Sequence, residues 1–140
     1  MSKVGFLFCL VCGLAIAAIP HHVAQGELTL APQLTAQAKG IHTLFISVYD
    51  PKSQMPMPVA AVKVDLSQDA KGSFYHFDLT PQTMMLMVSA SELPSVVNLK
   101  AKLDRDGSAG PDAPGDLVGW VKNVKVGAKN VKLTIDKAVR

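Results

Sequence analysis

The feature that most constrains this chain is the alternation of apolar and polar residues in several short runs. In residues 42–50, Leu44, Ile46 and Val48 occupy every second position. The same period of two recurs in residues 60–66, 75–79, 97–103 and 131–135. A period of two places one row of side chains on each face of a β-strand. Each run therefore predicts a strand with one buried face and one wet face.

Turn-forming residues separate these runs. Pro, Gly, Asp and Asn dominate the intervening segments, and only residues 32–39 are expected to form a helical turn. Residues 28–30 predict a short first strand, and residues 83–88 a less regular one. Seven or eight short strands without a sustained helical period predict an all-β fold, an antiparallel β-sandwich. Within it, we expect residues 95–136 to form a sheet edge wrapped around a polar loop.

The first 26 residues differ from the rest in composition. Lys3 precedes an apolar run of 16 residues, from Val4 to Ile19, that Pro20 ends. A positive start, an apolar middle and small residues near the end are typical of a secretory signal peptide. A membrane-spanning helix needs about 20 apolar residues. We therefore expect residues 1–26 to be an export signal with an apolar helix, or an uncleaved anchor at residues 4–19, and residues 27–140 to be the folded domain.

Charge and cysteine content exclude several classes of function. A net charge of +3 is too small, and too evenly spread, for a nucleic-acid-binding protein. Both cysteines, Cys9 and Cys12, lie in the apolar leader, so residues 27–140 can form no disulfide and have no thiol nucleophile. No triad signature, phosphate-binding loop or metal-ligand spacing of histidines is present. We predict no enzymatic activity and no cofactor.

The methionines are the most informative residues of the predicted domain. All five beyond the initiator fall in two clusters, which contain Met55, Met57, Met84, Met85 and Met87. Methionine supplies a flexible, polarizable apolar surface for a partner or an irregular core, and we favour this interpretation. The alternative is a copper carrier, because thioethers are soft ligands for Cu(I). Strand parity separates Met84 from Met85 and Met87, so a three-thioether copper site would need Met55 or Met57 as well.

The loop at residues 104–116 is rich in aspartate and glycine. Asp104, Asp106 and Asp112 are candidate calcium ligands, because alternate oxygen-bearing residues suit Ca²⁺. Two prolines interrupt the spacing, however, and no glutamate closes the loop. Since Asp and Gly are also the commonest turn residues, we predict a structural turn rather than a metal site.

The order of several segments resembles one known family. The segments are residues 55–62 (MPMPVAAV), the methionine pair 84–85, residues 115–119 (GDLVG) and the closing strand 131–136 (VKLTID). Together, over residues 26–137, they resemble the immunoglobulin-like C-terminal domain of the cytochrome c biogenesis protein CycH, also called CcmI. That family acts as an apocytochrome c chaperone in the haem-ligation machinery.

The resemblance implies an immunoglobulin-like sandwich that acts as a non-enzymatic binding module in the bacterial periplasm, with membrane contact only through an uncleaved leader. Its implied partners are apocytochrome c or subunits of the haem lyase. The predicted contact surface consists of Met55, Met57, Met84, Met85 and Met87, and we expect Asp116 and Trp120 to fix the last loop against the sheet. A periplasmic interaction domain with another partner is the alternative.

Overall fold

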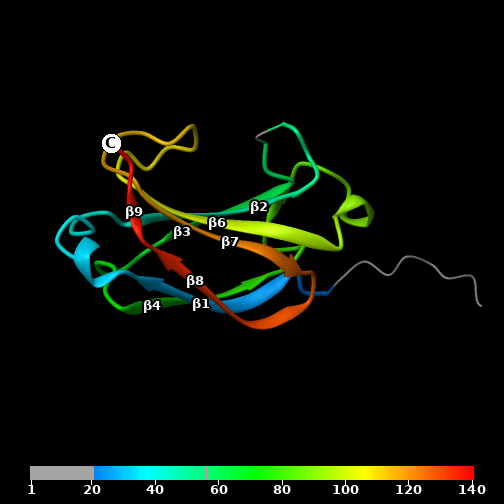
Figure 1. Ribbon diagram of the computed structural model, residues 1–140, viewed down its shortest axis with the longest axis horizontal. Helices are drawn as coiled ribbons and strands as arrows, with labels where there is room; N and C mark the ends of the chain where they lie inside the picture. The colour runs from blue at the N-terminus through cyan, green and yellow to red at the C-terminus, as the bar shows by residue number, and fades with distance from the viewer. Residues whose placement is uncertain (1–20, 56) are drawn as a thin grey trace, which may run out of the picture.

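Two β-sheets face each other across an apolar core (Figure 1). The computed structural model describes residues 21–55 and 57–140. Its strands are β1 (Ala24–Leu30), β2 (Thr43–Tyr49), β3 (Ala60–Asp65), β4 (Ser73–Leu79), β5 (Met85–Leu86), β6 (Val96–Asp104), β7 (Leu117–Lys125), β8 (Ala128–Ile135) and β9 (Lys137–Ala138). Two short 3-10 turns, η1 (Pro32–Leu34) and η2 (Ala90–Glu92), complete the described elements. The predicted all-β sandwich is confirmed.

The strands divide unequally between the sheets. One sheet has the order β4-β1-β8 and the other the order β5-β3-β2-β6-β7-β9. Seven of the described strands have six or more residues, whereas β5 and β9 have two each. Five of these long strands, β2, β3, β4, β6 and β8, contain the alternating runs, and β1 contains the short strand predicted at residues 28–30. None of these runs covers β7. The run at residues 83–88, in contrast, contributes only the short β5.

The core is built from the apolar positions of the alternating runs. Leu44, Ile46 and Val48 of β2 are fully buried, as are Leu99 and Leu103 of β6. The facing sheet contributes Leu28 from β1 and Leu133 and Ile135 from β8. Burial of these side chains is the main favourable term in folding the sandwich.

Two expectations about pairing are wrong. The sandwich is not wholly antiparallel, because β1 and β8 pair in parallel, with Leu30 opposite Ile135. Parallel neighbours need a long connection, and here nearly the whole domain lies between them. The sheet edge expected at residues 95–136 is wrong for β6, which lies in the middle of its sheet, between β2 and β7, whereas β8 is an edge strand of the smaller sheet. Alternation indicates that a strand has one apolar and one polar face, but it does not indicate which strands lie next to it.

The sandwich begins before residue 27. Val23 and Ala24 are fully buried, and the Val23 amide donates a hydrogen bond to the Leu79 carbonyl oxygen (2.7 Å). Residues 23–26 thus belong to the folded domain. The predicted leader helix at residues 1–20 lies outside the described residues. In the part of the chain that is described, no helix has the length and apolar character to cross a membrane.

The two sheets come into backbone contact where β7 passes β8. A Cβ atom on Gly119 of β7 would lie 1.9 Å from the Thr134 carbonyl oxygen and 2.7 Å from the Ile135 Cα. Just beyond, the Asp136 amide donates to the Val118 carbonyl oxygen (3.1 Å), and β9 pairs with β7. The chain thus crosses from the smaller sheet to the larger one at this point, and only glycine leaves room for it.

We predict that Gly119→Ala destabilises the domain by about 3 kcal/mol, because the new methyl group meets backbone atoms that cannot rotate away. Gly40→Ala is the matched control. Gly40 has φ +79°, and no atom lies within 4 Å of the place that a methyl group would take there, so this change should cost only about 1–2 kcal/mol. Urea unfolding followed by circular dichroism measures both. Equal losses in the two variants would contradict the close approach at Gly119.

Candidate functional site

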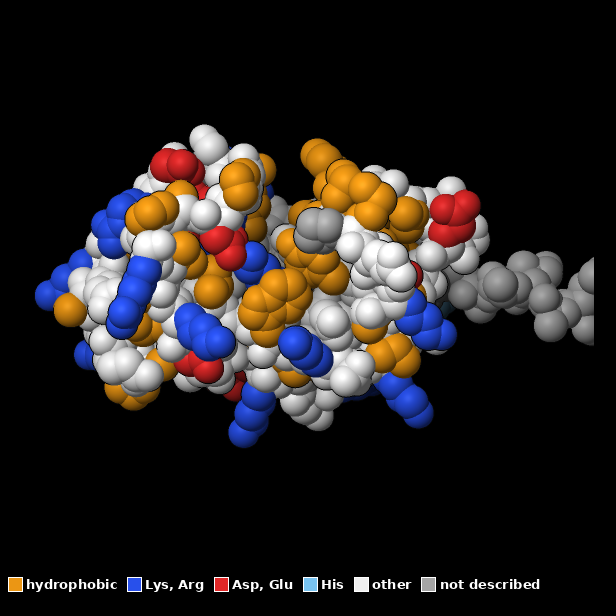
Figure 2. All heavy atoms as spheres, turned by 45° about the horizontal axis from the view of Figure 1, so that its top comes forward, with side chains coloured by type: hydrophobic (Ala, Val, Ile, Leu, Met, Phe, Trp, Pro, Cys, Tyr) orange, Lys and Arg blue, Asp and Glu red, His pale blue; other side chains and the backbone are white. Residues whose placement is uncertain are grey.

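Large exposed hydrophobic side chains gather on the outer face of the six-stranded sheet and its adjoining loops (Figure 2). Within the described residues they are Met55 (66% exposed), Met57 (62%), Met85 (70%), Met87 (49%) and Trp120 (43%). Leucine and isoleucine, in contrast, are confined to buried and half-buried positions in this part of the chain. The exposed set thus consists of thioethers and one indole.

Strand register explains why residues far apart in the sequence share this face. Met85 of β5 pairs with Ala61 of β3, which pairs with Ser47 of β2. Ser47 pairs with Lys100 of β6, and Lys100 pairs with Trp120 of β7. One row of side chains therefore crosses five strands, from Met85 at one end to Trp120 at the other.

Trp120 belongs to an aromatic platform. Its ring centroid lies 5.1 Å from that of Tyr49, with the planes tilted by 45°. The Lys100 ammonium group lies 5.3 Å from the centroid of the indole, within the range of a cation–π contact. Burial, and secondly the Asp112 carboxylate, raise the pKa of the Tyr49 phenol. Trp120 thus lies on the accessible face of the sheet and not in the core.

Two lysines of β6 hold the aspartate-rich loop against the same face. The Lys100 ammonium group donates to both carboxylate oxygens of Asp112 (2.7 Å each). The Lys102 ammonium group donates to the Gly110 carbonyl oxygen (2.9 Å) and lies 3.3 Å from Asp104 Oδ2. The Lys102 side chain is only 8% exposed, because the loop folds over it. These contacts make the loop one wall of the site.

Asp116 anchors both ends of this loop. Its Oδ1 accepts a hydrogen bond from the Arg105 amide (3.0 Å), and its Oδ2 accepts one from the Ala113 amide (2.9 Å). The residue is 2% exposed. A buried carboxylate that satisfies two backbone donors fixes the path of a loop. Its position is therefore structural, beneath the surface that a partner could reach.

The carboxylates of the candidate calcium ligands bind other groups of the protein. Asp104 Oδ1 accepts hydrogen bonds from the amides of Asp106 (3.1 Å) and Gly107 (2.9 Å), and Asp112 is held by Lys100. Burial is the main cause that raises the pKa of the Asp104 carboxyl. Among the described residues, no three His, Cys, Asp or Glu side chains are grouped so as to hold a metal ion. Asp104, Asp106 and Asp112 do not converge on one point.

The methionines separate as their parity predicts. Met84 is 7% exposed and packs in the core, whereas its neighbour Met85 faces outward. The Met87 amide donates to the Val59 carbonyl oxygen (2.8 Å), which extends the β3–β5 pairing by one position. Met85 and Met87 therefore lie beside the segment that leads from Met57 into β3, and Met84 is not among the exposed methionines.

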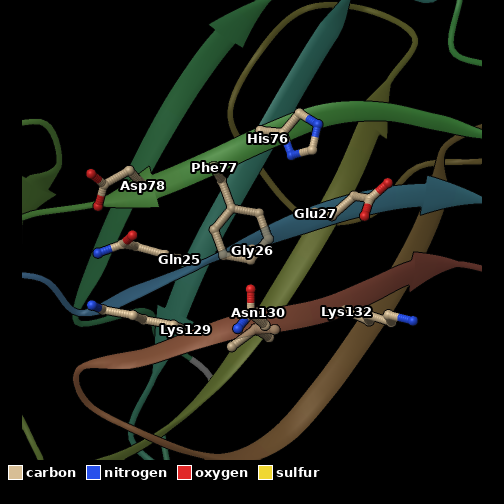
Figure 3. A pocket seen from close by; sticks show the side chains of 10 residues that line it. Gln25, Gly26, Glu27, His76, Phe77, Asp78, Lys129, Asn130 and Lys132 are labelled. Atoms are coloured by element: carbon tan, nitrogen blue, oxygen red, sulfur yellow. The ribbon is translucent and has the colours of Figure 1, made fainter.

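A separate hollow of about 490 Å³ lies on the three-stranded sheet, between β4, β1 and β8 (Figure 3). Asn130 has φ +57°, and an irregularity in the β1–β8 register lies beside Gly26. The Phe77 ring lies close to Gly26, 2.8 Å from where a Cβ atom would stand. The rim carries both acids and lysines, such as Asp78 and Lys132. No predicted site residue lines this hollow.

The comparison with protein families agrees with the fold and the signature segments. The model of the cytochrome c-type biogenesis protein H Ig-like domain matches residues 24–136. The chain belongs to this family. Membership of the CycH Ig-like family indicates a role in the cytochrome c maturation system. No curated protein and no solved structure matches the chain.

The segment that most clearly carries the resemblance to the CycH Ig-like family is scaffold. In residues 115–119, Gly115 has φ +95° and Asp116 anchors the loop. Gly119 has no side chain, which lets the backbone of β8 approach closely. Leu117 is fully buried. Sequence reasoning also missed the Tyr49–Lys100–Trp120 arrangement, because only the pairing of three strands brings these residues together.

We predict that Asp116→Ala destabilises the domain by about 2–4 kcal/mol, since two backbone amides lose their buried acceptor. Asp106→Ala is the control in the same loop. Asp106 is exposed and accepts one hydrogen bond, from the Ser108 amide, so its loss should cost less than about 1 kcal/mol. Urea unfolding gives the free-energy changes. Similar values for both variants would show that Asp116 does not anchor the loop.

Proposed function

We propose that this domain is a non-enzymatic module that binds apocytochrome c, the haem-free chain, in the bacterial periplasm during cytochrome c maturation. One observation carries the proposal: the exposed methionines and Trp120 gather on one face of a sandwich that belongs to the CycH Ig-like family. Delivery to the periplasm rests on the export signal predicted at residues 1–26.

An unfolded partner suits the chemistry of this face. Concentrated exposed apolar surface marks a binding site, and methionine side chains adapt their shape to different partners. Trp120 and Tyr49 add rigid apolar area with polar edges. An apocytochrome lacks the haem around which its core packs, and so exposes apolar segments of varied sequence. An adaptable surface can hold such segments without reading one fixed motif.

The polar groups of the face favour binding over catalysis. Lys100 is paired with Asp112, and Lys102 with Asp104. The Asp116 carboxylate accepts hydrogen bonds from two backbone amides. Groups engaged in this way shape the rim of a contact surface and orient a partner.

A subunit of the haem lyase is the second partner that the family suggests. A folded subunit presents one fixed surface, for which leucine and aromatic side chains would give a better-defined fit than four flexible thioethers. The exposed set here is mostly thioether. We therefore favour the apocytochrome over the lyase subunit.

We predict that the double variant Met85→Gln/Met87→Gln binds apocytochrome c at least tenfold more weakly, a loss of about 1.4 kcal/mol, because the amides keep the side-chain length but remove apolar contact. The matched control Met85→Leu/Met87→Leu keeps the apolar area and should bind within about threefold of the wild type. Titration of the purified protein with chemically prepared apocytochrome c, and separately with the haem-containing form, measures these affinities.

Binding of apocytochrome but not of the haem-containing protein, lost in the glutamine variant and retained in the leucine variant, supports the proposal. Equal affinity for both forms, or an unchanged affinity in the glutamine variant, contradicts it. Recovery of haem-lyase subunits without apocytochrome, in a capture from periplasmic extract, would favour the lyase as partner instead.

A further inference from the structure

The β5 segment and the loop that leads into β3 both carry exposed thioethers at one edge of the six-stranded sheet. Met57, Met85 and Met87 are 62%, 70% and 49% exposed. We propose that these three residues form a binding site for a soft monovalent metal ion, Cu(I). This inference goes beyond the binding of apocytochrome and requires a different property of the same side chains.

The pairing of β3 with β5 places Met85 and Met87 beside the segment that leads from Met57 into β3. Met85 pairs with Ala61, and the Met87 amide donates to the Val59 carbonyl oxygen (2.8 Å). Met85 lies in β5 and Met87 directly follows it, and two positions of extended chain separate Cα atoms by about 7 Å. Met57 is two residues from Val59, at most about 7 Å along the chain. Side chains with three rotatable bonds can close such gaps.

The choice of residue at these positions argues for a thioether function. Leucine is the main large side chain of the core, and it would supply the same apolar area at the edge. What methionine adds to an exposed position is a polarizable sulfur with free lone pairs, which is a soft ligand that prefers Cu(I) over hard cations. Three neutral thioethers satisfy a soft ion of single charge without a carboxylate.

The proposed site leaves out two of the methionines. Met84 is 7% exposed and belongs to the core cluster, so its sulfur is not available at the edge. Met55 is exposed but lies further along the loop, where its amide contacts the Ser53 hydroxyl (3.3 Å). Met57, Met85 and Met87 are therefore the proposed ligand set, and Met84 is an internal control of the same chemical type.

The site has a distinctive pH behaviour. Thioethers do not take up a proton in the ordinary pH range, whereas imidazole ligands lose metal as they are protonated. The histidines of the described chain include His42, which contacts Asp69 (2.9 Å), and His76 on the opposite sheet. A site made of Met57, Met85 and Met87 should keep its Cu(I) affinity between pH 7.5 and pH 5, while a histidine site should lose most of it.

The test is anaerobic titration of the purified protein with Cu(I), kept reduced by ascorbate, against a chromophoric Cu(I) chelator. We expect one ion per chain in the wild type, and at least tenfold weaker binding in Met57→Leu/Met85→Leu/Met87→Leu. Met84→Leu should bind as the wild type does. Circular dichroism and thermal melting of each variant show whether its fold is intact.

Several results would overturn the site: wild-type binding no tighter than that of the triple leucine variant, a loss in Met84→Leu as large as in the triple variant, or a tenfold loss between pH 7.5 and pH 5. Because leucine retains the apolar contact, the triple variant should still bind apocytochrome c. Loss of Cu(I) binding alone therefore tests the metal site, and loss of apocytochrome binding in the glutamine variant tests the proposed function.

Discussion

The backbone contact between β7 and β8 is the constraint on which the rest of the sandwich depends. Gly119 lets the Thr134 carbonyl oxygen approach to where a side chain would otherwise stand, and the chain can then leave the smaller sheet and pair β9 with β7. This crossing joins the two sheets along one side. It also fixes the start of β7, where Asp116 ties the preceding loop to Arg105 and Ala113. The loop wall of the candidate site is thus set by a contact in the scaffold.

Local properties of the fold could be predicted from the sequence, whereas pairings could not. Alternation located five of the seven long strands and identified Leu44, Ile46 and Val48 as core residues, because the period of two acts within one strand. It also separated Met84 from Met85. The central place of β6 and the parallel pairing of β1 with β8 depend on residues about 50 to 100 positions apart, and no local pattern encodes such neighbours.

In the candidate site, too, local features could be predicted from the sequence and contacts between strands could not. The methionines were identifiable because clusters of an uncommon residue are visible in the sequence itself. Trp120 is a lone aromatic residue in a strand, a pattern equally typical of the core, and its contacts with Tyr49 and Lys100 follow only from register. Lys102 is a lysine on the outer face, where alternation predicts exposure, yet its side chain is 8% exposed under the loop. The burial of one residue was decided here by a segment eight residues away.

The row from Met85 to Trp120 limits what can bind across the whole face. The two apolar ends are separated by Ala61, Ser47 and Lys100, one residue from each intervening strand. Adjacent strands lie about 4.8 Å apart, so the ends are about 19 Å from each other. A segment that contacts both must run across the strands, and needs about 13 residues as a helix or about six as an extended chain. Since Lys100 lies beneath its path, paired with Asp112, the middle of such a segment must be small or polar while its ends are apolar.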